Sequence, residues 1–206
     1  MRKSDLERYI ETARESSATI LSNLKRAADL VQSFKQVAVD QTAAEAREFN
    51  LRQFLDEALM SLRPRYKRTS HTVTVDVPED ITLYSYPGDL MQVVTNFMTN
   101  SLLHGFEDME NGHMRFVASY EGDKVVLEYS DDGKGMDADH VERVFEPFFT
   151  TKRGHGGTGL GMHIVYNIVT QRLKGTIVCR SAPGEGAAFR LVFPRDVRKG
   201  GGSGER

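Results

Sequence analysis

Asn96, Asn100 and His104 have the spacing of groups that act together, because they follow one another at intervals of four residues. On a helix, this spacing places all three side chains on one stripe. The surrounding run, residues 89 to 106, is otherwise apolar at helical spacing, and asparagine is a poor helix former with no local reason to be there. A neutral amide oxygen is a hard ligand, which suits a Mg²⁺ ion held otherwise by phosphates and water.

Asp131 follows an alternating run, residues 125 to 129, that predicts a strand ending at a turn. The turn contains Gly133 and Gly135, which would let backbone approach a ligand closely. We therefore expect a carboxylate at a strand end, next to a glycine turn that a ligand can reach.

A second glycine cluster, Gly157, Gly159 and Gly161, opens an apolar helix that we expect from Leu160 to about Val169. A helix that opens in glycines presents free N–H groups and the positive end of its dipole, which suits phosphate. The cationic pair at 152–153 precedes this cluster.

The residues Gly154, Gly156 and Gly159 also match G-x-G-x-x-G. A dinucleotide site needs a strand just before that pattern. The preceding run FEPFFTTKR carries Pro147 and does not read as a core strand. A P-loop is excluded because the sequence contains no G-x-x-x-x-G-K-[ST].

Together these segments resemble the ATP-binding domain of the sensor histidine kinases, in the GHKL superfamily that includes gyrase and MutL. Asn96 to His104 resembles the N box, Asp131 to Met136 the G1 box, Phe145 to Lys152 the F box and Gly157 to Met162 the G2 box. All four occur in the family's order and spacing, across about residues 49 to 195, and the FFTTK form of the F box points to the histidine kinases.

The resemblance implies ATP and Mg²⁺ as ligands, with ATP between the helices and a mobile lid before the G2 box. It implies that Asp131 accepts a hydrogen bond from the adenine amino group and that Asn100 ligates Mg²⁺. It assigns catalytic roles to Asn100, His104 and Lys152. The expected nucleotide-binding residues are Asn96, Asn100, His104, Asp131, Gly133, Gly135, Met136, Lys152, Arg153, Gly157, Thr158, Gly159, Leu160, Gly161 and Met162.

Hydrolysis in this superfamily needs a carboxylate one helical turn before the metal-binding asparagine. Here that position is Asn96, an amide, which does not accept a proton at pH 7. The site should therefore bind ATP without hydrolysing it, which suits a kinase. Phosphoryl transfer is mainly positioning and charge stabilisation, and the cations available for this are Lys152, Arg153 and His104, although each also has an ordinary structural interpretation.

Composition narrows the class of protein. The chain has 206 residues, a formal net charge of −2 and a pI near 6.3, with no nucleic-acid signature. Its one cysteine, Cys179, excludes an internal disulfide and fits a reducing compartment. No apolar run approaches the ~20 residues that span a bilayer. We expect a cytoplasmic location, including as the cytoplasmic part of a membrane-bound sensor.

Residues 4 to 39 contain neither glycine nor proline, and their apolar positions alternate spacings of four and three from Leu6 to Ala38. This 3.5-residue period predicts a long coiled-coil-like helix that needs a partner helix. It resembles the second helix of the kinase dimerisation and phosphotransfer domain. The acceptor histidine of the first helix is missing, because no histidine precedes His71. We expect the chain to begin between the two helices of a longer protein, with a natural protein without an acceptor as the alternative.

The predicted fold is α+β: a two-layer sandwich of a mixed sheet of about five strands and three main helices, the Bergerat type. Strands are expected around Val73–Val77, at ITLYS (81–85), at 114–120 and 124–129, and at 176–181 and 187–193. A helix capped by Asn50 should end near Pro64. The expected division is a dimerisation helix at 1–40, a hinge at 41–50, the ATP-binding domain at 51–195 and a flexible tail at 196–206.

The function expected from these features is the catalytic and ATP-binding part of a two-component sensor histidine kinase. It would transfer the γ-phosphoryl group to a histidine outside this chain and would not phosphorylate itself. Expected partners are a second copy through the N-terminal helix, the acceptor-histidine helix of the parent kinase and a response regulator. The alternative is a non-catalytic ATP-binding dimerisation or regulatory module, and an anti-sigma serine kinase is weaker because it would not need the long helix.

Overall fold

A mixed sheet of five strands, in the order β2-β4-β5-β7-β6, forms the centre of the protein. The structure is a computed structural model that describes residues 9–17, 19–20, 24, 45–67, 69–152 and 157–198. β2 pairs in parallel with β4, and the other neighbours are antiparallel. The strands are β2 (Thr72–Asp76), β4 (His113–Glu121), β5 (Lys124–Asp131), β6 (Thr176–Ser181) and β7 (Ala187–Pro194). The predicted mixed five-stranded α+β fold is confirmed.

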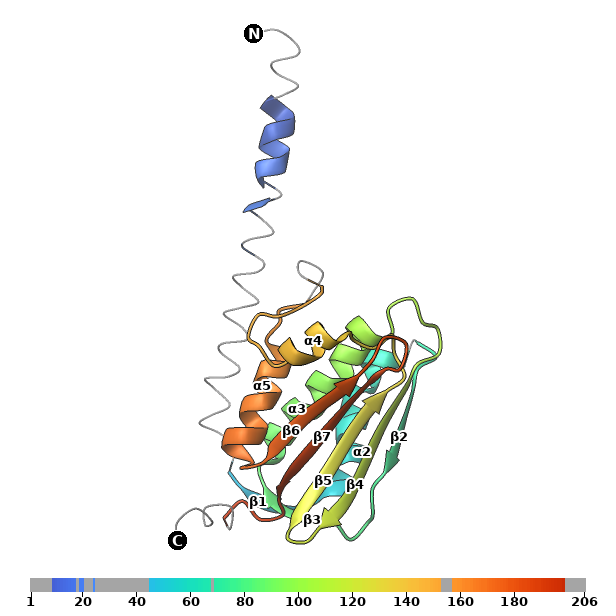
Figure 1. Cartoon of the computed structure of the whole chain (residues 1–206), viewed down its shortest axis with the longest axis vertical. Helices are drawn as coiled ribbons and strands as arrows, with labels where there is room; N and C mark the ends of the chain where they lie inside the picture. Colours follow the sequence, from blue (N-terminus) through green and yellow to red (C-terminus); the bar gives the residue numbers. More distant parts are fainter. Residues whose placement is uncertain are drawn as a thin grey trace.

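The main helices cover one face of this sheet, so the core lies between two layers (Figure 1). They are α2 (Leu51–Tyr66), α3 (Pro87–Asn100) and α5 (Gly161–Asn167). In β5, Leu127 and Tyr129 are buried toward the helices, whereas Glu128 between them is exposed. The ring of Phe97 on α3 stacks on Tyr129, with centroids 5.0 Å apart and planes 3° from parallel. This contact ties the N-box helix to the strand that carries Asp131.

The helices of the N and G2 boxes both change geometry in their last turn. α3 begins at Pro87, whose fixed φ favours the first helical position. It continues into the π-helical segment η1 (Ser101–Gly105), which closes with a bond from the N–H of Phe106 to the carbonyl of Ser101 at 2.8 Å. Likewise, α5 continues into η2 (Ile168–Arg172). The sequence predicted both helices but not the change to π geometry, which the residue pattern does not encode.

The predicted strand at ITLYS is present, but it lies outside the main sheet. It is β3 (Thr82–Ser85), and it pairs antiparallel with β1 (Arg47–Asn50) in a separate two-stranded sheet. The polar stretch 47–50, which was expected to be part of the hinge at 41–50, forms a strand here. Residues 41–44 lie outside the described part of the chain.

α2 starts where predicted and ends later than predicted. Asn50 caps it, because its side-chain oxygen accepts a hydrogen bond from the N–H of Gln53 at 2.9 Å. Pro64 lies inside the helix, and the turn still closes through a bond from the N–H of Lys67 to the carbonyl of Arg63 at 2.8 Å. Proline has no N–H to donate to the carbonyl of Met60, four residues before it, and Met60 is 75% exposed. The helix thus ends at Tyr66, within two residues of the end predicted near Pro64.

A short helix, α4 (Ala138–Arg143), was not predicted; it begins at Asp137, whose side chain accepts from the N–H of His140. Both predicted hairpins are present, β4–β5 and β6–β7. Of the long N-terminal helix, the described residues 9–17, 19, 20 and 24 are helical, and the other residues of 1–40 lie outside the described part, as do 199–206. Within the described residues, no helix has both the length and the apolar character needed to cross a bilayer.

Candidate active site

Asp131, at the end of β5, has most of its hydrogen-bonding capacity filled by the protein. Its Oδ1 accepts the backbone N–H groups of Gly133 at 3.0 Å and Ala187 at 3.2 Å, and its Oδ2 accepts the hydroxyl of Ser101 at 2.5 Å. A carboxylate offers about four acceptor positions, so these bonds leave about one for a ligand donor. Burial raises the pKa of Asp131, and the bond from Ser101 and the two backbone bonds oppose that rise.

The end of the N-box helix meets the G1 turn backbone to backbone. The N–H of Lys134 donates to the carbonyl of Gly105 at 2.9 Å, and a Cβ on Gly133 would lie 2.7 Å from the Cα of Gly105. Gly135 has φ +70°, and a Cβ there would meet the carbonyl oxygen of Ala182 at 1.9 Å. In this structure the G1 glycines bring the turn against protein backbone, rather than against an open space for a ligand.

The β6–β7 hairpin supports the same turn from the other side. The N–H of Met136 donates to the hydroxyl of Ser181 at 2.8 Å, and that hydroxyl donates to the carbonyl of Gly186 at 2.5 Å. The N–H of Gly184 donates to the carbonyl of Lys134 at 2.8 Å. The Met136 side chain is partly buried against the core. The hairpin therefore fixes the turn next to Asp131, a role that its sequence did not predict.

Asn96 and Asn100, one turn apart on α3, both lie opposite the start of α5. A Cβ added to Gly161 would lie 3.3 Å from Oδ1 of Asn96 and 3.8 Å from Oδ1 of Asn100. Nδ2 of Asn96 is buried and has no hydrogen-bond partner among the described residues. Since buried amide donors are nearly always bonded, this atom fits a ligand oxygen. The described residues contain no group of three or more His, Cys, Asp or Glu side chains able to hold a metal, so a cation here would rely on amide oxygens and on its own phosphate ligands.

Beyond Asn100, the helix ends in a cluster of charged side chains. Glu107 accepts from Nζ of Lys134 at 2.7 Å with one oxygen and pairs with Nζ of Lys152 through the other. These two hydrogen bonds lower the pKa of Glu107 to about 2. His104 lies beside the cluster, with Nδ1 3.3 Å from the hydroxyl of Thr151. Burial and the fields of Lys134 and Lys152 lower the pKa of His104, which disfavours the cationic form considered from the sequence.

The G2 box packs against the F box through its glycines. A Cβ on Gly157 would lie 2.5 Å from the hydroxyl of Thr150, and one on Gly159, where φ is +70°, would lie 2.5 Å from the carbonyl carbon of Phe148. Between them, the hydroxyl of Thr158 accepts from the N–H of Leu160 at 3.3 Å. These close approaches set the position of the F box relative to the start of α5.

His163, on the first turn of α5, adds a side-chain link to the F box. Its Nδ1 donates to the carbonyl of Phe145 at 3.1 Å, and its Nε2 accepts from the amide of Asn167 at 3.1 Å. The neighbouring Met162 is buried, and Leu160 is half-buried. Arg153, which was expected in the nucleotide site, lies outside the described residues.

The N-box helix is the hub of the site, because it contacts each of the other three motifs. Ser101 and Gly105 touch Asp131 and the G1 turn, Asn96 and Asn100 face the G2 box, and His104 reaches the F box. Four further residues of this cluster were not predicted: Ser101, Tyr129, Glu107 and Lys134. A serine in an apolar helix and a tyrosine at an inward strand position are weak signals for the first two, and nothing in the sequence pairs Glu107 with its lysines.

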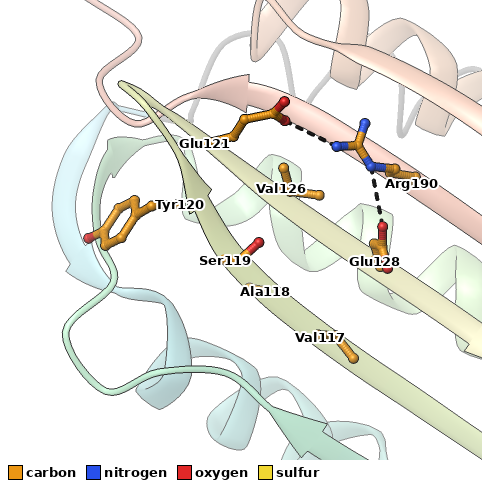
Figure 2. A pocket seen from close by; sticks show the side chains of 8 residues that line it. All are labelled: Val117, Ala118, Ser119, Tyr120, Glu121, Val126, Glu128 and Arg190. Carbon is orange, nitrogen blue, oxygen red and sulfur yellow. Dashed lines mark hydrogen bonds and ion pairs between the residues drawn. The ribbon is translucent and has the colours of Figure 1, made fainter.

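A surface hollow lies elsewhere in the described structure, on the sheet. It has a volume of about 220 Å³ and is lined by the outward side chains of the sheet, including Val126, Glu128 and Arg190 (Figure 2). Arg190 pairs there with Glu121 at 3.0 Å and with Glu128 at 3.2 Å. This face is opposite the helices, so the hollow is separate from the cluster around Asp131 and Asn100.

Comparison with known proteins gives relatives for this arrangement. Residues 86–197 match the family described as histidine kinase-, DNA gyrase B- and HSP90-like ATPase. Sporulation kinase E of Bacillus subtilis is 31% identical over 178 residues, which is 85% of this chain and 23% of that protein. The chain thus spans about a quarter of the length of this relative.

Solved structures agree with the fold. The catalytic domain of histidine kinase ThkA has 25% identity and a TM-score of 0.66, over 75% of this chain and 99% of that domain. The structure of ThkA in complex with the response regulator protein TrrA has 20% identity and a TM-score of 0.67, over 97% of this chain and 54% of that chain, and it supports the fold alone. The predicted resemblance to the ATP-binding domain of the sensor histidine kinases is confirmed. The chain belongs to the family of histidine kinase-, DNA gyrase B- and HSP90-like ATPases.

Proposed function

We propose that this chain binds Mg-ATP and is the catalytic part of a sensor histidine kinase, transferring the γ-phosphoryl group to a histidine on another polypeptide segment. The observation that carries the proposal is that one helix, α3 with its continuation η1, contacts both parts of the candidate site. Its end touches Asp131, which keeps about one acceptor position, and its preceding turns hold two amide oxygens against Gly161. The first suits the donor edge of adenine, and the second suits a metal–phosphate group.

At the base end, Asp131 accepts from the adenine amino group, supported by Gly133, Gly135 and Met136. The hydrogen bonds from Gly133 and Ala187 hold the carboxylate in one orientation before the nucleotide arrives. Such preorganisation reduces the free energy that binding must spend on ordering the site.

At the phosphate end, Asn100 ligates Mg²⁺ through its amide oxygen, and the buried Nδ2 of Asn96 donates to a ligand oxygen. Mg²⁺, when bound, neutralises charge that develops on the phosphoryl oxygens. His104, Lys152 and Arg153 contact the phosphates. The G2 residues Gly157, Thr158, Gly159, Leu160, Gly161 and Met162 line the phosphate side, and Asn100, His104 and Lys152 are the catalytic residues.

Lys152 must leave Glu107 to reach a phosphate, because the two side chains are paired in this structure. Asn96 stands where a carboxylate would activate water, and an amide does not accept a proton at neutral pH. The site therefore protects ATP from hydrolysis until a nucleophile is presented.

The acceptor is a histidine of the parent kinase outside this chain. The described histidines are engaged within the domain: His71 accepts from the N–H of Gly112, and His113 lies within hydrogen-bonding distance of Thr72 and Thr74. His104 and His163 have the partners described above, and Nδ1 of His140 lies 2.7 Å from Oδ1 of Asp137. Residues 1–40 serve as the dimerisation helix, 41–46 as the hinge, 47–195 as the ATP-binding domain, since β1 pairs with β3, and 196–206 as the tail. A response regulator is the onward partner, and the site of action is the cytoplasm.

Binding is tested first, with a fluorescent ATP analogue and Mg²⁺. Asp131→Asn should bind about 10- to 100-fold more weakly, because a charged hydrogen bond contributes about 1.5–3 kcal/mol. Asn100→Ala should remove the Mg²⁺ dependence of binding. If both variants bind like the wild type, the site assignment is wrong.

Transfer is tested with γ-labelled ATP, with and without a fragment that carries the acceptor helix of the parent kinase. The chain alone should remain unlabelled, and the fragment should gain an acid-labile, base-stable phosphohistidine. Near-stoichiometric label on the chain alone would reveal an acceptor within it. Binding of ATP with no label on any fragment would support the alternative, a non-catalytic regulatory module.

A further inference from the structure

Tyr129, Ser101 and Asp131 form a hydrogen-bonded chain that leads from the core to the site. Oγ of Ser101 lies 2.7 Å from the Tyr129 hydroxyl and 2.5 Å from Oδ2 of Asp131. Tyr129 is fully buried, and Ser101 is 2% exposed. The two residues come from different layers, Tyr129 from β5 and Ser101 from η1 at the end of α3.

The direction of this chain follows from counting protons. An ionised carboxylate only accepts, so the single hydroxyl proton of Ser101 is donated to Asp131. The Ser101 oxygen then accepts from Tyr129, whose phenol stays protonated because burial raises its pKa. Donation therefore runs from Tyr129 to Ser101 to Asp131, and each step depends on the one before it.

The aromatic core fixes the first member of the chain. The Tyr129 ring stacks on Phe97 at 5.0 Å and packs on Phe116 at 4.8 Å with an interplanar angle of 51°. Phe97 lies one helical turn before Ser101, so the same face of the helix that packs on the ring also presents the serine. The phenol cannot turn its hydroxyl away from Ser101 without disturbing this packing.

We infer that Ser101 and Tyr129 are positioning residues that make Asp131 selective for a 6-amino purine over a 6-keto purine, an inference that rests on the proposed binding of ATP. With Oδ2 held by Ser101 and Oδ1 by two backbone N–H groups, Asp131 presents a fixed acceptor to the base. An amino group donates to that acceptor. A keto oxygen in the same place would face the carboxylate oxygen of Asp131, and two acceptors form no hydrogen bond.

Loss of the Ser101 hydroxyl weakens this selectivity in two ways. It removes the only side-chain donor to Asp131 among the described residues, which frees Oδ2 to reorient. It also removes a hydrogen bond that favours the charged form, while burial and the neighbouring Asp132 continue to raise the pKa. The remaining groups near the carboxylate give little compensation, since Tyr129 and the half-buried thiol of Cys179 are both neutral, with pKa values raised by burial. A protonated carboxyl group can donate to a keto oxygen, so a 6-keto base becomes acceptable.

The test compares ATP with inosine triphosphate, whose base carries a keto group at the same position, by calorimetry of the full chain with Mg²⁺. The variants are Ser101→Ala and Tyr129→Phe, which removes only the phenol oxygen. Ser85→Ala is the matched control, because Ser85 is fully buried and its hydroxyl has no hydrogen-bond partner among the described residues.

The wild type and Ser85→Ala should both prefer ATP by about tenfold or more. Ser101→Ala should reduce this ratio about tenfold, and Tyr129→Phe by about threefold, with ATP affinity changing more than inosine triphosphate affinity. A purely structural role would weaken both nucleotides equally and leave the ratio unchanged, which would overturn the inference.

Two other outcomes are distinguishable. If the wild type binds neither nucleotide, the proposed function fails and the inference fails with it. If the wild type prefers ATP and Tyr129→Phe, which keeps the ring packing, retains the full ratio, the inference alone is overturned, even where Ser101→Ala does not fold.

Discussion

Lys152 of the F box and Glu107 at the end of the N-box helix form an ion pair across 45 residues of sequence. Lys134 of the G1 turn binds the other oxygen of the same carboxylate at 2.7 Å. The Glu107 carboxylate thus forms ion pairs with two lysines beside the proposed phosphate site. Since Lys152 is proposed to contact phosphate, Glu107 and the nucleotide compete for it.

Glu107→Gln should therefore tighten Mg-ATP binding. A neutral amide holds both lysines less strongly, so less interaction is lost when the phosphates recruit Lys152, and we expect about a two- to fivefold lower Kd. The measurement is a calorimetric titration at low and high salt, with Glu110→Gln as a control that makes the same charge change at an exposed position. Equal or weaker binding by Glu107→Gln would show that no competition exists.

Gly161→Ala should separate stability from binding. Alanine at the start of α5 favours the helix by up to about 1 kcal/mol, so Tm should stay level or rise. The new methyl group would lie 3.3 Å from Oδ1 of Asn96, where it restricts the amide that must meet the ligand. We expect Mg-ATP binding to weaken by about 1–3 kcal/mol, the usual cost of leaving a buried donor such as the Asn96 amide without its hydrogen-bond partner.

Gly122→Ala should give the opposite result in the same two measurements, a lower Tm with unchanged Mg-ATP binding. Gly122 has φ +65° in the β4–β5 turn, and nothing lies within 4 Å of an added Cβ. Alanine there is strained by its backbone alone, so Tm should fall while binding stays unchanged. If both variants lose affinity in proportion to their change in Tm, then the contact between Gly161 and Asn96 has no specific role.

Asp131 should make folding more favourable as the pH falls. Its pKa is raised from an ordinary value of 3.8, chiefly by burial, so the folded state binds the proton more tightly than the unfolded state. The free energy of unfolding of the wild type, relative to Asp131→Asn, should rise as the pH falls through the raised pKa, and the gain should be complete below about 3.8. Urea unfolding between pH 3 and pH 7 measures this difference.

Glu107 gives the opposite slope in the same experiment. Its pKa is lowered from 4.5 to about 2 by the two lysines, so its stabilising contribution is present above pH 4.5 and is lost as the pH falls toward 2. The wild type should therefore lose stability relative to Glu107→Gln over the lower part of the range. If the stability difference from the matched variant changed with pH in the same direction for both residues, the raised pKa of Asp131 and the lowered pKa of Glu107 would be contradicted.

Much of the domain could be predicted because its signals are local. Alternation in residues 125–129 gives the strand that ends at Asp131, and the spacing of Asn96 and Asn100 gives their shared helix face. The cap at Asn50 is likewise a matter of neighbouring residues. Each of these patterns repeats within one element, so a single sequence reveals it.

The remainder depends on contacts between distant segments. β1 is four residues long and exists as a strand because β3 pairs with it, so its own residues carry little signal. The link between Tyr129 and Ser101 requires the register of a helix end against a strand, and η1 shifts that register by its π geometry. Pro64 lies in the last turn of α2, so it indicated the end of the helix to within two residues but did not fix the last residue.

The N-terminal segment should make the chain self-associate. Among its described helical residues, Ile10, Ile20 and Leu24 are 49%, 60% and 63% exposed. Their positions fall on the 3.5-residue period predicted from Leu6 to Ala38, so they share one stripe. A helix with an exposed apolar stripe gains stability by burying it against a partner, and a second copy supplies an identical stripe.

Ile20→Glu combined with Leu24→Glu should convert the dimer to a monomer, because four like charges would meet at the interface. Sedimentation equilibrium over a range of concentrations measures the change, and Mg-ATP binding should be retained because the site lies in the separate ATP-binding domain. Met60→Glu is the matched control: Met60 is 75% exposed on α2, outside the stripe, and should leave the assembly unchanged. A wild-type chain that stays monomeric at high concentration would refute the dimer, and a Met60→Glu monomer would place the interface on α2 instead.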